Sequence, residues 1–133
     1  MSTLDFDHTI IPSHNKESSA KFYEEIFGFE DIGEMEGMHA VRINSTAILF
    51  IMDSDSSPWS QGVRHYAFTT DKKKFDHIFA KIKASGKPYG DEWDTPENMK
   101  GPTRKTWVIG AKGKGETLYF KDPYDNLLQI ITY

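Results

Sequence analysis

Two histidines and one glutamine are the residues of this sequence whose types and spacing could do chemistry. His8 and His65 each lie in a short stretch of strand type, and Gln129 interrupts the last apolar run. Histidine is the commonest protein ligand for metal ions, and a glutamine oxygen can also coordinate a divalent cation. If the three side chains converged, they could hold an ion and leave positions open for substrate oxygens. The alternative is that they hydrogen-bond one another, or water, in a metal-free polar cleft.

A predicted hairpin over residues 116–133 positions the glutamine. Asp122 can close an Asx-turn, Pro123 presets φ at the corner, and Asn126 tolerates a left-handed conformation. Period-two alternation places Gln129 on the same face as Leu127, Ile131 and Tyr133. A buried amide without a partner there would cost roughly 1–3 kcal/mol. We therefore expect Gln129 to have a polar partner.

A strand followed by a helix positions each histidine. Residues 5–12 alternate polar and apolar until Pro12, which puts His8 on the face of Phe6 and Ile10. Ser13 or Asn15 can cap a helix that ends near Phe27, before Gly28. Residues 63–69 predict a second strand, and Asp71 caps a second helix that ends before Gly86.

The two patterns are in phase, because His8 precedes Phe22 by fourteen residues and His65 precedes Phe79 by fourteen. This spacing indicates an internal repeat, with β-α-β-β-β occurring twice. A short strand in 29–37 and a hairpin of 38–43 and 46–52 across Asn44-Ser45 complete the first copy, and the second hairpin strand is apolar throughout, as if covered on both faces. Turn residues fill 53–62, the predicted boundary, and the long polar segment 91–115 suggests a partly ordered lid.

Composition restricts the class of protein. The 133 residues suit one domain, and no apolar run approaches the roughly 18 residues that a membrane-spanning helix needs. A net charge of −4 argues against a nucleic-acid partner. The chain contains no cysteine and shows no secretory signal at its start, so we expect a cytoplasmic protein with a small-molecule ligand and no membrane partner.

Four stretches of the sequence together resemble the vicinal oxygen chelate superfamily of glyoxalases, bleomycin-resistance proteins and extradiol dioxygenases. These stretches are FDHTIIP around His8, the helix ending FYEEIFGFE, RHYAF around His65, and LYFKDPYDNLLQI around Gln129. The resemblance covers essentially the whole chain. It implies an α+β fold with two βαβββ modules, about 4–53 and 62–133, whose sheets curl around a central cleft within one domain. It also implies a homodimer.

The resemblance implies a metal site as well. His8 and His65 match two ligand positions, and Gln129 matches a third that is usually glutamate. A further ligand position of some relatives falls among residues 48–51, none of which can coordinate an ion. The expected cofactor is a divalent Fe, Mn, Ni or Zn ion, or none, because Gln129 brings no negative charge. We also expect any ion to bind more weakly than in a relative with glutamate.

Other residues are candidates for substrate contact or catalysis. Glu116 is the carboxylate nearest the final hairpin and a weak candidate for a general base; no other catalytic residue is identified. Aromatic side chains and one cation could form the wall of a ligand cleft, although each could equally be ordinary packing or surface. These are Phe50, Trp59, Tyr66, Arg104, Trp107 and Tyr119.

The leading hypothesis is a metal-assisted enzyme of lyase, isomerase or dioxygenase type that acts on a small oxygen-bearing substrate. The main alternative is a non-catalytic protein that sequesters a ligand or drug, as bleomycin-resistance proteins do, with a degenerate metal site. Gln129 and the apolar strand 46–52 favour this alternative. A weaker one is thiol transfer of the fosfomycin-resistance type, suggested by the Gly/Lys loop 110–115, although glutamate would be expected at position 129.

Overall fold

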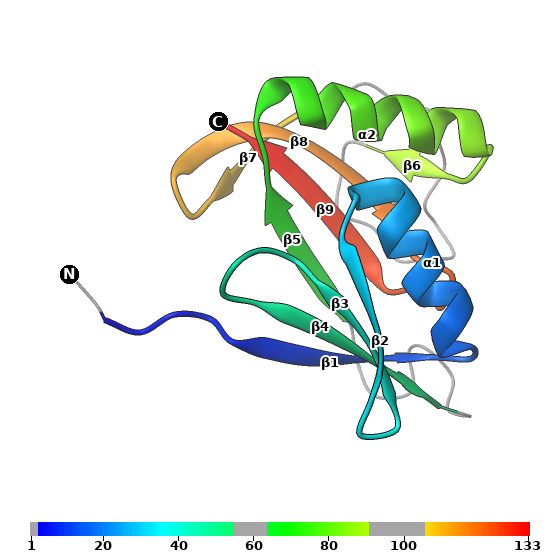
Figure 1. Cartoon of the computed structure of the whole chain (residues 1–133). Helices are drawn as coiled ribbons and strands as arrows, with labels where there is room; N and C mark the ends of the chain where they lie inside the picture. Colours follow the sequence, from blue (N-terminus) through cyan, green and yellow to red (C-terminus); the bar gives the residue numbers. More distant parts are fainter. Residues whose placement is uncertain (1–2, 55–63, 91–105) are drawn as a thin grey trace. The chain divides into compact units, whose positions relative to one another are not determined.

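The computed structural model describes residues 3–54, 64–90 and 106–133, without the side chains of Thr106 and Trp107. It divides into two compact units, Met1–Ser60 and Gln61–Tyr133. Each unit contains one helix on one sheet (Figure 1). Neither described helix is long and apolar enough to cross a membrane.

The first unit is a four-stranded sheet with one helix. Its sheet has the order β1-β4-β3-β2, with β1 parallel to β4 and the other neighbours antiparallel. This is the predicted βαβββ arrangement. The elements are β1 (His8–Ser13), α1 (Lys16–Phe27), β2 (Glu30–Met35), β3 (Met38–Arg42) and β4 (Ile48–Asp53).

Local chemistry sets the limits of α1. The Asn15 side chain accepts a hydrogen bond from the Ser18 N–H at 3.0 Å, which satisfies one of the free donors of the first turn. Gly28 ends the helix with φ of 77°, a left-handed conformation that glycine adopts without strain. Phe22, Tyr23 and Phe27 lie on one face and are buried, as predicted from their spacing.

Three details of this unit differ from expectation. Strand β1 continues through Pro12 to Ser13, and the sheet tolerates this proline because β1 lies at its edge. Strand β4 is fully covered on one face and partly covered on the other: Leu49 and Ile51 are buried, whereas Ile48 and Phe50 are half-buried. The β3–β4 turn extends beyond two residues, since the Asn44 side-chain oxygen accepts hydrogen bonds at 2.9 Å from the N–H groups of both Thr46 and Ala47.

The second unit repeats the first and adds a strand. Its sheet has the order β5-β9-β8-β6, and β5 is parallel to β9, as β1 is to β4. Two short strands, rather than the single one predicted, pair with different halves of the nine-residue β8. The elements are β5 (His65–Thr69), α2 (Lys72–Ser85), β6 (Tyr89–Gly90), β7 (Thr106–Gly110), β8 (Gly113–Lys121) and β9 (Leu127–Thr132).

The β8–β9 hairpin forms where it was predicted. One Asp122 carboxylate oxygen accepts the N–H groups of Tyr124 at 2.8 Å and Asn126 at 2.9 Å, and the other accepts the Asn126 side-chain amide at 2.7 Å. The left-handed residue of the turn is Asp125, with φ of 64°, and not Asn126 as expected. Asn126 instead uses its side chain to tie the turn to Asp122.

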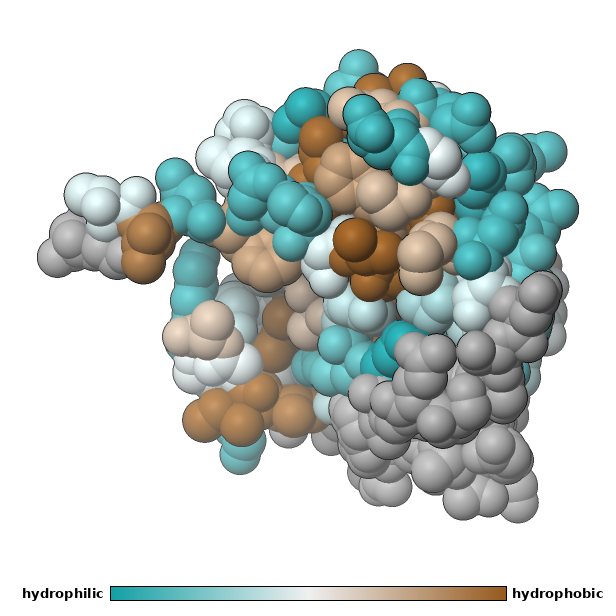
Figure 2. Space-filling model, turned by 90° about the horizontal axis from the view of Figure 1, so that it is seen from below, coloured by the Kyte–Doolittle hydropathy of each residue, from teal (hydrophilic) through white to brown (hydrophobic). Residues whose placement is uncertain are grey.

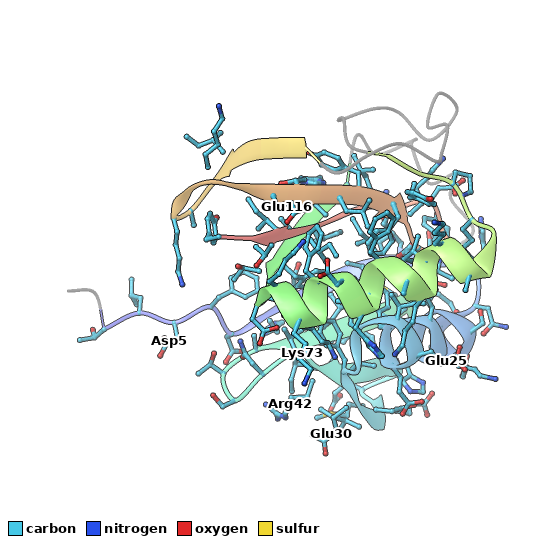
Figure 3. All side chains as sticks on the ribbon, turned by 90° about the horizontal axis from the view of Figure 1, so that it is seen from above. Asp5, Glu25, Glu30, Arg42, Lys73 and Glu116 are labelled. Carbon is cyan, nitrogen blue, oxygen red and sulfur yellow. The ribbon has the colours of Figure 1, made fainter. Side chains whose placement is uncertain are left out.

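The strand face that carries His8 is open in the described chain. Phe6 and Ile10, which share this face by alternation, are 65% and 45% exposed, and Leu4 is 87% exposed. Figure 2 shows the N-terminal segment at the left with a hydrophobic side chain on its surface. On the neighbouring strands β2 and β3, the Arg42 Nε atom lies 4.0 Å from a Glu30 carboxylate oxygen, and Figure 3 labels both residues.

Candidate functional site

His65 and Gln129 meet on one face of the second sheet. In the parallel β5–β9 pair, His65 lies opposite Leu127 and Ala67 lies opposite Gln129, so all four side chains leave the sheet on the same side. The His65 Nε2 atom is 2.9 Å from the Gln129 Oε1 atom. Gln129 is only 6% exposed. The polar partner that burial of this amide requires is therefore His65.

The backbone assigns the protons of the His65 ring. Its Nδ1 atom lies 3.2 Å from the carbonyl oxygen of Leu127, which can only accept, so Nδ1 carries the hydrogen and donates it. A neutral ring then has a lone pair on Nε2, and that lone pair faces Gln129 Oε1, a second acceptor. Two hydrogen-bond acceptors, His65 Nε2 and Gln129 Oε1, repel each other at 2.9 Å unless a cation or a proton lies between them. The other solution is a reversed Gln129 amide, which donates its N–H to Nε2.

Thr117 holds the other end of the amide. The Gln129 Nε2 group donates to Thr117 Oγ1 at 3.4 Å, and that hydroxyl donates to the Gly115 carbonyl at 3.3 Å. If the amide reverses, the same hydroxyl can turn and donate to the amide oxygen. Thr117 can therefore serve either orientation, and in both of them the neutral His65 ring keeps its Nε2 lone pair toward Gln129.

Burial favours the neutral ring. Desolvation lowers the pKa of His65 below its ordinary value of 6.5, and the hydrogen bonds to Gln129 and to the Leu127 carbonyl oppose this only in part. His65 is thus predominantly uncharged at neutral pH. A neutral imidazole with its Nδ1–H donated to a backbone carbonyl is the form in which histidine coordinates a metal through Nε2.

In the first unit, His8 is also hydrogen-bonded through its Nδ1 atom. Its Nδ1 atom is 2.5 Å from an Asp7 carboxylate oxygen, and its side chain is 48% exposed. Because the carboxylate can only accept, Nδ1 donates its hydrogen, and Nε2 is the ring nitrogen that faces away from this bond. A carboxylate partner of this kind orients histidine ligands in metal sites. The Phe50 ring and this imidazole form a T-shaped pair with 5.3 Å between ring centres.

Register shows which strand-four residue corresponds to Gln129. In the first unit His8 lies opposite Ile48 and Ile10 lies opposite Phe50, whereas in the second His65 lies opposite Leu127 and Ala67 lies opposite Gln129. Phe50 and Gln129 therefore occupy equivalent positions in the repeat. The same place relative to the strand histidine holds an aromatic ring in one unit and an amide in the other.

One candidate for substrate contact lies beside His65 and Gln129. Tyr119 lies directly opposite Gln129 in the β8–β9 pair, and its ring centre is 6.0 Å from that of His65. Burial raises the pKa of Tyr119 above 10, so its phenol stays protonated at neutral pH. By strand alternation Tyr66, the residue after His65, points to the other side of the sheet. The two tyrosines thus have different environments.

Glu116 is not brought to the His65–Gln129 pair. It lies opposite Thr132, so alternation places it on the face away from Gln129, where it accepts from Lys72 of α2 at 2.9 Å. Figure 3 labels Glu116 on β8. Its selection as a general base thus gains no support from the geometry. Trp59 and Arg104 lie outside the described residues, and of Trp107, in β7, only the backbone is described.

A pocket adjoins the pair on the same unit. It has a volume of about 230 Å³ and is lined by Gln129, Ile131 and Tyr133, by β5, and by the tip of the β7–β8 hairpin. Among the described residues, no group of three or more His, Cys, Asp or Glu side chains is placed to hold a metal ion. Among the described side chains of this face, one imidazole nitrogen and one amide oxygen are neutral and of types that coordinate divalent ions.

A family model covers nearly the whole of this chain. The model of the glyoxalase/bleomycin resistance protein/dioxygenase superfamily matches residues 5–130. The chain belongs to this superfamily. Its two βαβββ repeats, each with a parallel pair formed by its first and last strands, are the expected α+β fold. No curated protein matches the chain.

Solved structures of the superfamily support the fold. "Oxidase ChaP-H2" is 28% identical with a TM-score of 0.79, over 99% of this chain and 95% of that one. "Oxidase ChaP-H1" is 24% identical with a TM-score of 0.75, over 98% and 97% of the two chains. A lactoylglutathione lyase from Agrobacterium tumefaciens is 16% identical with a TM-score of 0.64, over 95% and 91%. The last two likenesses concern the fold alone.

Sequence reasoning missed three contributors to this candidate site. They are the Thr117 hydroxyl, the Leu127 carbonyl and Tyr133. Alternation along the last strand had already placed Tyr133 on the Gln129 face, so the signal was present for this residue. The roles of Thr117 and of the Leu127 carbonyl depend on register between strands, which a single sequence does not reveal.

Proposed function

We propose that this superfamily member is a metal-assisted enzyme, of oxidase or dioxygenase type, that acts on a small oxygen-bearing substrate. The observation that carries the proposal is the facing of His65 Nε2 and Gln129 Oε1 at 2.9 Å, with the His65 Nδ1–H committed to the Leu127 carbonyl. The likeness to "Oxidase ChaP-H2" favours oxidation among the chemistries of the superfamily.

In this proposal His65 Nε2 and Gln129 Oε1 are two ligands of a divalent ion. His8 remains the predicted third ligand, and because its Nδ1 atom is bonded to Asp7, Nε2 is the nitrogen that would coordinate. When bound, such an ion supplies a Lewis acid that stabilises negative charge on a substrate oxygen. The ligand atoms of His65 and Gln129 are uncharged, so they would leave the positive charge of the ion uncompensated.

Residues around the ligands orient them and restrict water. Thr117 accepts one amide hydrogen of Gln129 at 3.4 Å, which directs the amide oxygen toward His65. The Tyr119 ring stands 6.0 Å from the His65 ring and is buried, so it limits water beside the imidazole. Its protonated phenol is a hydrogen-bond donor at neutral pH, suited to a substrate oxygen that gains negative charge.

Metal titration tests the proposal. Protein purified without an affinity tag should bind one equivalent of Fe, Mn, Ni or Zn in calorimetry, with an affinity tighter than millimolar. His65→Ala should weaken that binding at least tenfold, as loss of a ligand does, and His8→Ala should do the same if His8 is the third ligand. His77→Ala is the matched control, because His77 lies on α2 and should leave binding unchanged.

Sequestration of a ligand without chemistry is the second candidate. The observation in its favour is Phe50, which stands at the position equivalent to Gln129 and packs against His8 at 5.3 Å. If no ion binds below millimolar concentration, the enzyme proposal fails and sequestration becomes the better account.

A further inference from the structure

The pocket beside Gln129 is lined mainly by apolar groups. Its volume is about 230 Å³, below the range of roughly 300–1,000 Å³ typical of sites for drug-sized ligands, so it suits a molecule of about one ring. The polar residues in its lining are Thr69, Lys112, Gln129 and Tyr133. The walls between them are Ala67, Phe68, Ile109, Gly110, Ala111 and Ile131.

The Tyr133 hydroxyl is held in place by the β7–β8 turn. The backbone N–H of Lys112 donates to the Tyr133 oxygen at 3.2 Å. The phenol uses its oxygen as the acceptor in this bond, and no acceptor for its own hydrogen is found in the described part of the chain. A ligand oxygen in the pocket could therefore receive that hydrogen.

Two glycines make room for the tyrosine. A Cβ atom added at Gly110 would stand 2.2 Å from the Tyr133 hydroxyl, and one at Gly115 would stand 3.0 Å from the Tyr133 ring. The distance at Gly110 is too short for the Tyr133 hydroxyl to stay in place, whereas an added atom at Gly115 would first meet the Thr132 carbonyl oxygen, at 2.7 Å, and would displace the ring only slightly. The absence of side chains at these positions lets Tyr133 lie against the hairpin with its hydroxyl at the pocket.

Lys112 supplies the cation of the pocket lining. In the ranges that the structure describes, no carboxylate lies within ion-pair distance of Lys112, whereas Lys72 pairs with Glu116 on the opposite face of the sheet. An exposed ammonium alone would bind an anion weakly. Lys112 is exposed, so solvent screens its charge, and it adds to anion binding chiefly because it stands beside the fixed Tyr133 hydroxyl.

From these features we infer that the pocket binds a small carboxylate with an apolar body of about one ring. The ligand carboxylate accepts hydrogen bonds from Tyr133 and Lys112, and the apolar body of the ligand lies against Ile109 and Ile131. A second oxygen-bearing group of the ligand, separate from the carboxylate, reaches toward Gln129. This inference deepens the proposed function, on which it rests for the role of the ligand as substrate. Binding of the carboxylate itself needs no metal.

Benzoate is the probe, and benzamide, of similar shape and without charge, is the matched control ligand. Binding is measured by NMR in EDTA at pH 7.5 for the wild type, Lys112→Ala, Tyr133→Phe and Lys114→Ala. Tyr133→Phe should weaken benzoate about tenfold, the loss expected for one hydrogen bond to a charged group, and Lys112→Ala should weaken it about threefold, because its ammonium is exposed. Lys114→Ala, an exposed neighbour outside the pocket lining, should change affinity less than twofold.

Three results would overturn the inference. Benzamide could bind as well as benzoate, Lys112→Ala and Lys114→Ala could weaken benzoate equally, or benzoate could fail to bind at all. The test is independent of the metal. If benzoate depends on Lys112 while no ion binds, the carboxylate site stands and the metal-assisted function fails. If an ion binds at His65 and benzoate does not bind, the reverse holds.

Discussion

Replacing Gln129 by glutamate should reverse the direction in which the protein shifts the pKa of His65. In the wild type, burial lowers this pKa, and a neutral amide oxygen 2.9 Å away opposes burial only in part. Glutamate places a negative charge in the same position. Two opposite unit charges about 4 Å apart attract by roughly 4 kcal/mol at an effective dielectric constant of about 20, equivalent to about 3 pKa units.

The net shift is smaller, because the new carboxylate must also lose water at a site that is 6% exposed. An opposite charge at this range typically raises a histidine pKa by about 1–3 units. We therefore expect His65 to titrate above 6.5 in metal-free Gln129→Glu and below 6.5 in the wild type.

NMR titration of the His65 ring protons in EDTA measures both values. Gln129→Leu is the control, because it removes the hydrogen-bond partner without adding charge and should lower the pKa further. The same Gln129→Glu variant should bind divalent ions at least tenfold more tightly, since it adds a charged ligand. If His65 titrates alike in the wild type and in Gln129→Glu, residue 129 does not face His65 Nε2 in solution and the site as described is wrong.

The remaining predictions concern the support of the site and the fold. Thr117→Val should weaken ion binding about tenfold, as loss of a group that orients a ligand does, while Thr69→Val on the same sheet face should not; calorimetry measures both. Because the pKa of folded His65 lies below the unfolded value of about 6.5, the unfolded chain binds more protons, so the free energy of unfolding in EDTA should fall as the pH drops below about 6.5. Urea unfolding at pH 7.5 and 5.5 should show this loss, and His65→Gln should reduce it. Asp122→Ala should lower the free energy of unfolding by several kcal/mol, because three buried donors lose their acceptor at roughly 1–3 kcal/mol each; a loss below 1 kcal/mol would contradict the role given to the turn.

Most of the fold could be predicted because its signals are local. Asn15 and Asp71 cap the two helices, and Gly28 and Gly86 end them, through chemistry that involves only neighbouring residues. The repeat could also be predicted from a local signal, since fourteen residues separate His8 from Phe22 and His65 from Phe79. The errors arose where longer contacts decide: β1 runs through Pro12 because it is an edge strand, and one long β8 accommodates two short partners.

The candidate site could be predicted only in part. Alternation placed Gln129 on a buried face and required a partner for it, and the partner proved to be His65. The proton arrangement could not be predicted, because it depends on the carbonyl of Leu127, which carries no signal in the side-chain sequence. Glu116 was selected as a possible base because it is near the hairpin in sequence. The β8–β9 register instead directs its side chain to the other face of the sheet, where it pairs with Lys72.

We propose that His65 Nε2, which faces Gln129 Oε1 at 2.9 Å, is a metal-donor atom and that Gln129 is its companion ligand. The most direct test is a titration of protein labelled with ¹⁵N at histidine, in which Zn²⁺ is added and each ring nitrogen is followed by NMR. The Nε2 signal of His65 should shift and saturate at one equivalent of Zn²⁺, with Nδ1 still protonated, while the signals of His14, His39 and His77 stay unchanged. If millimolar Zn²⁺ leaves His65 Nε2 unchanged, the protein does not hold a metal at this position and the account is contradicted.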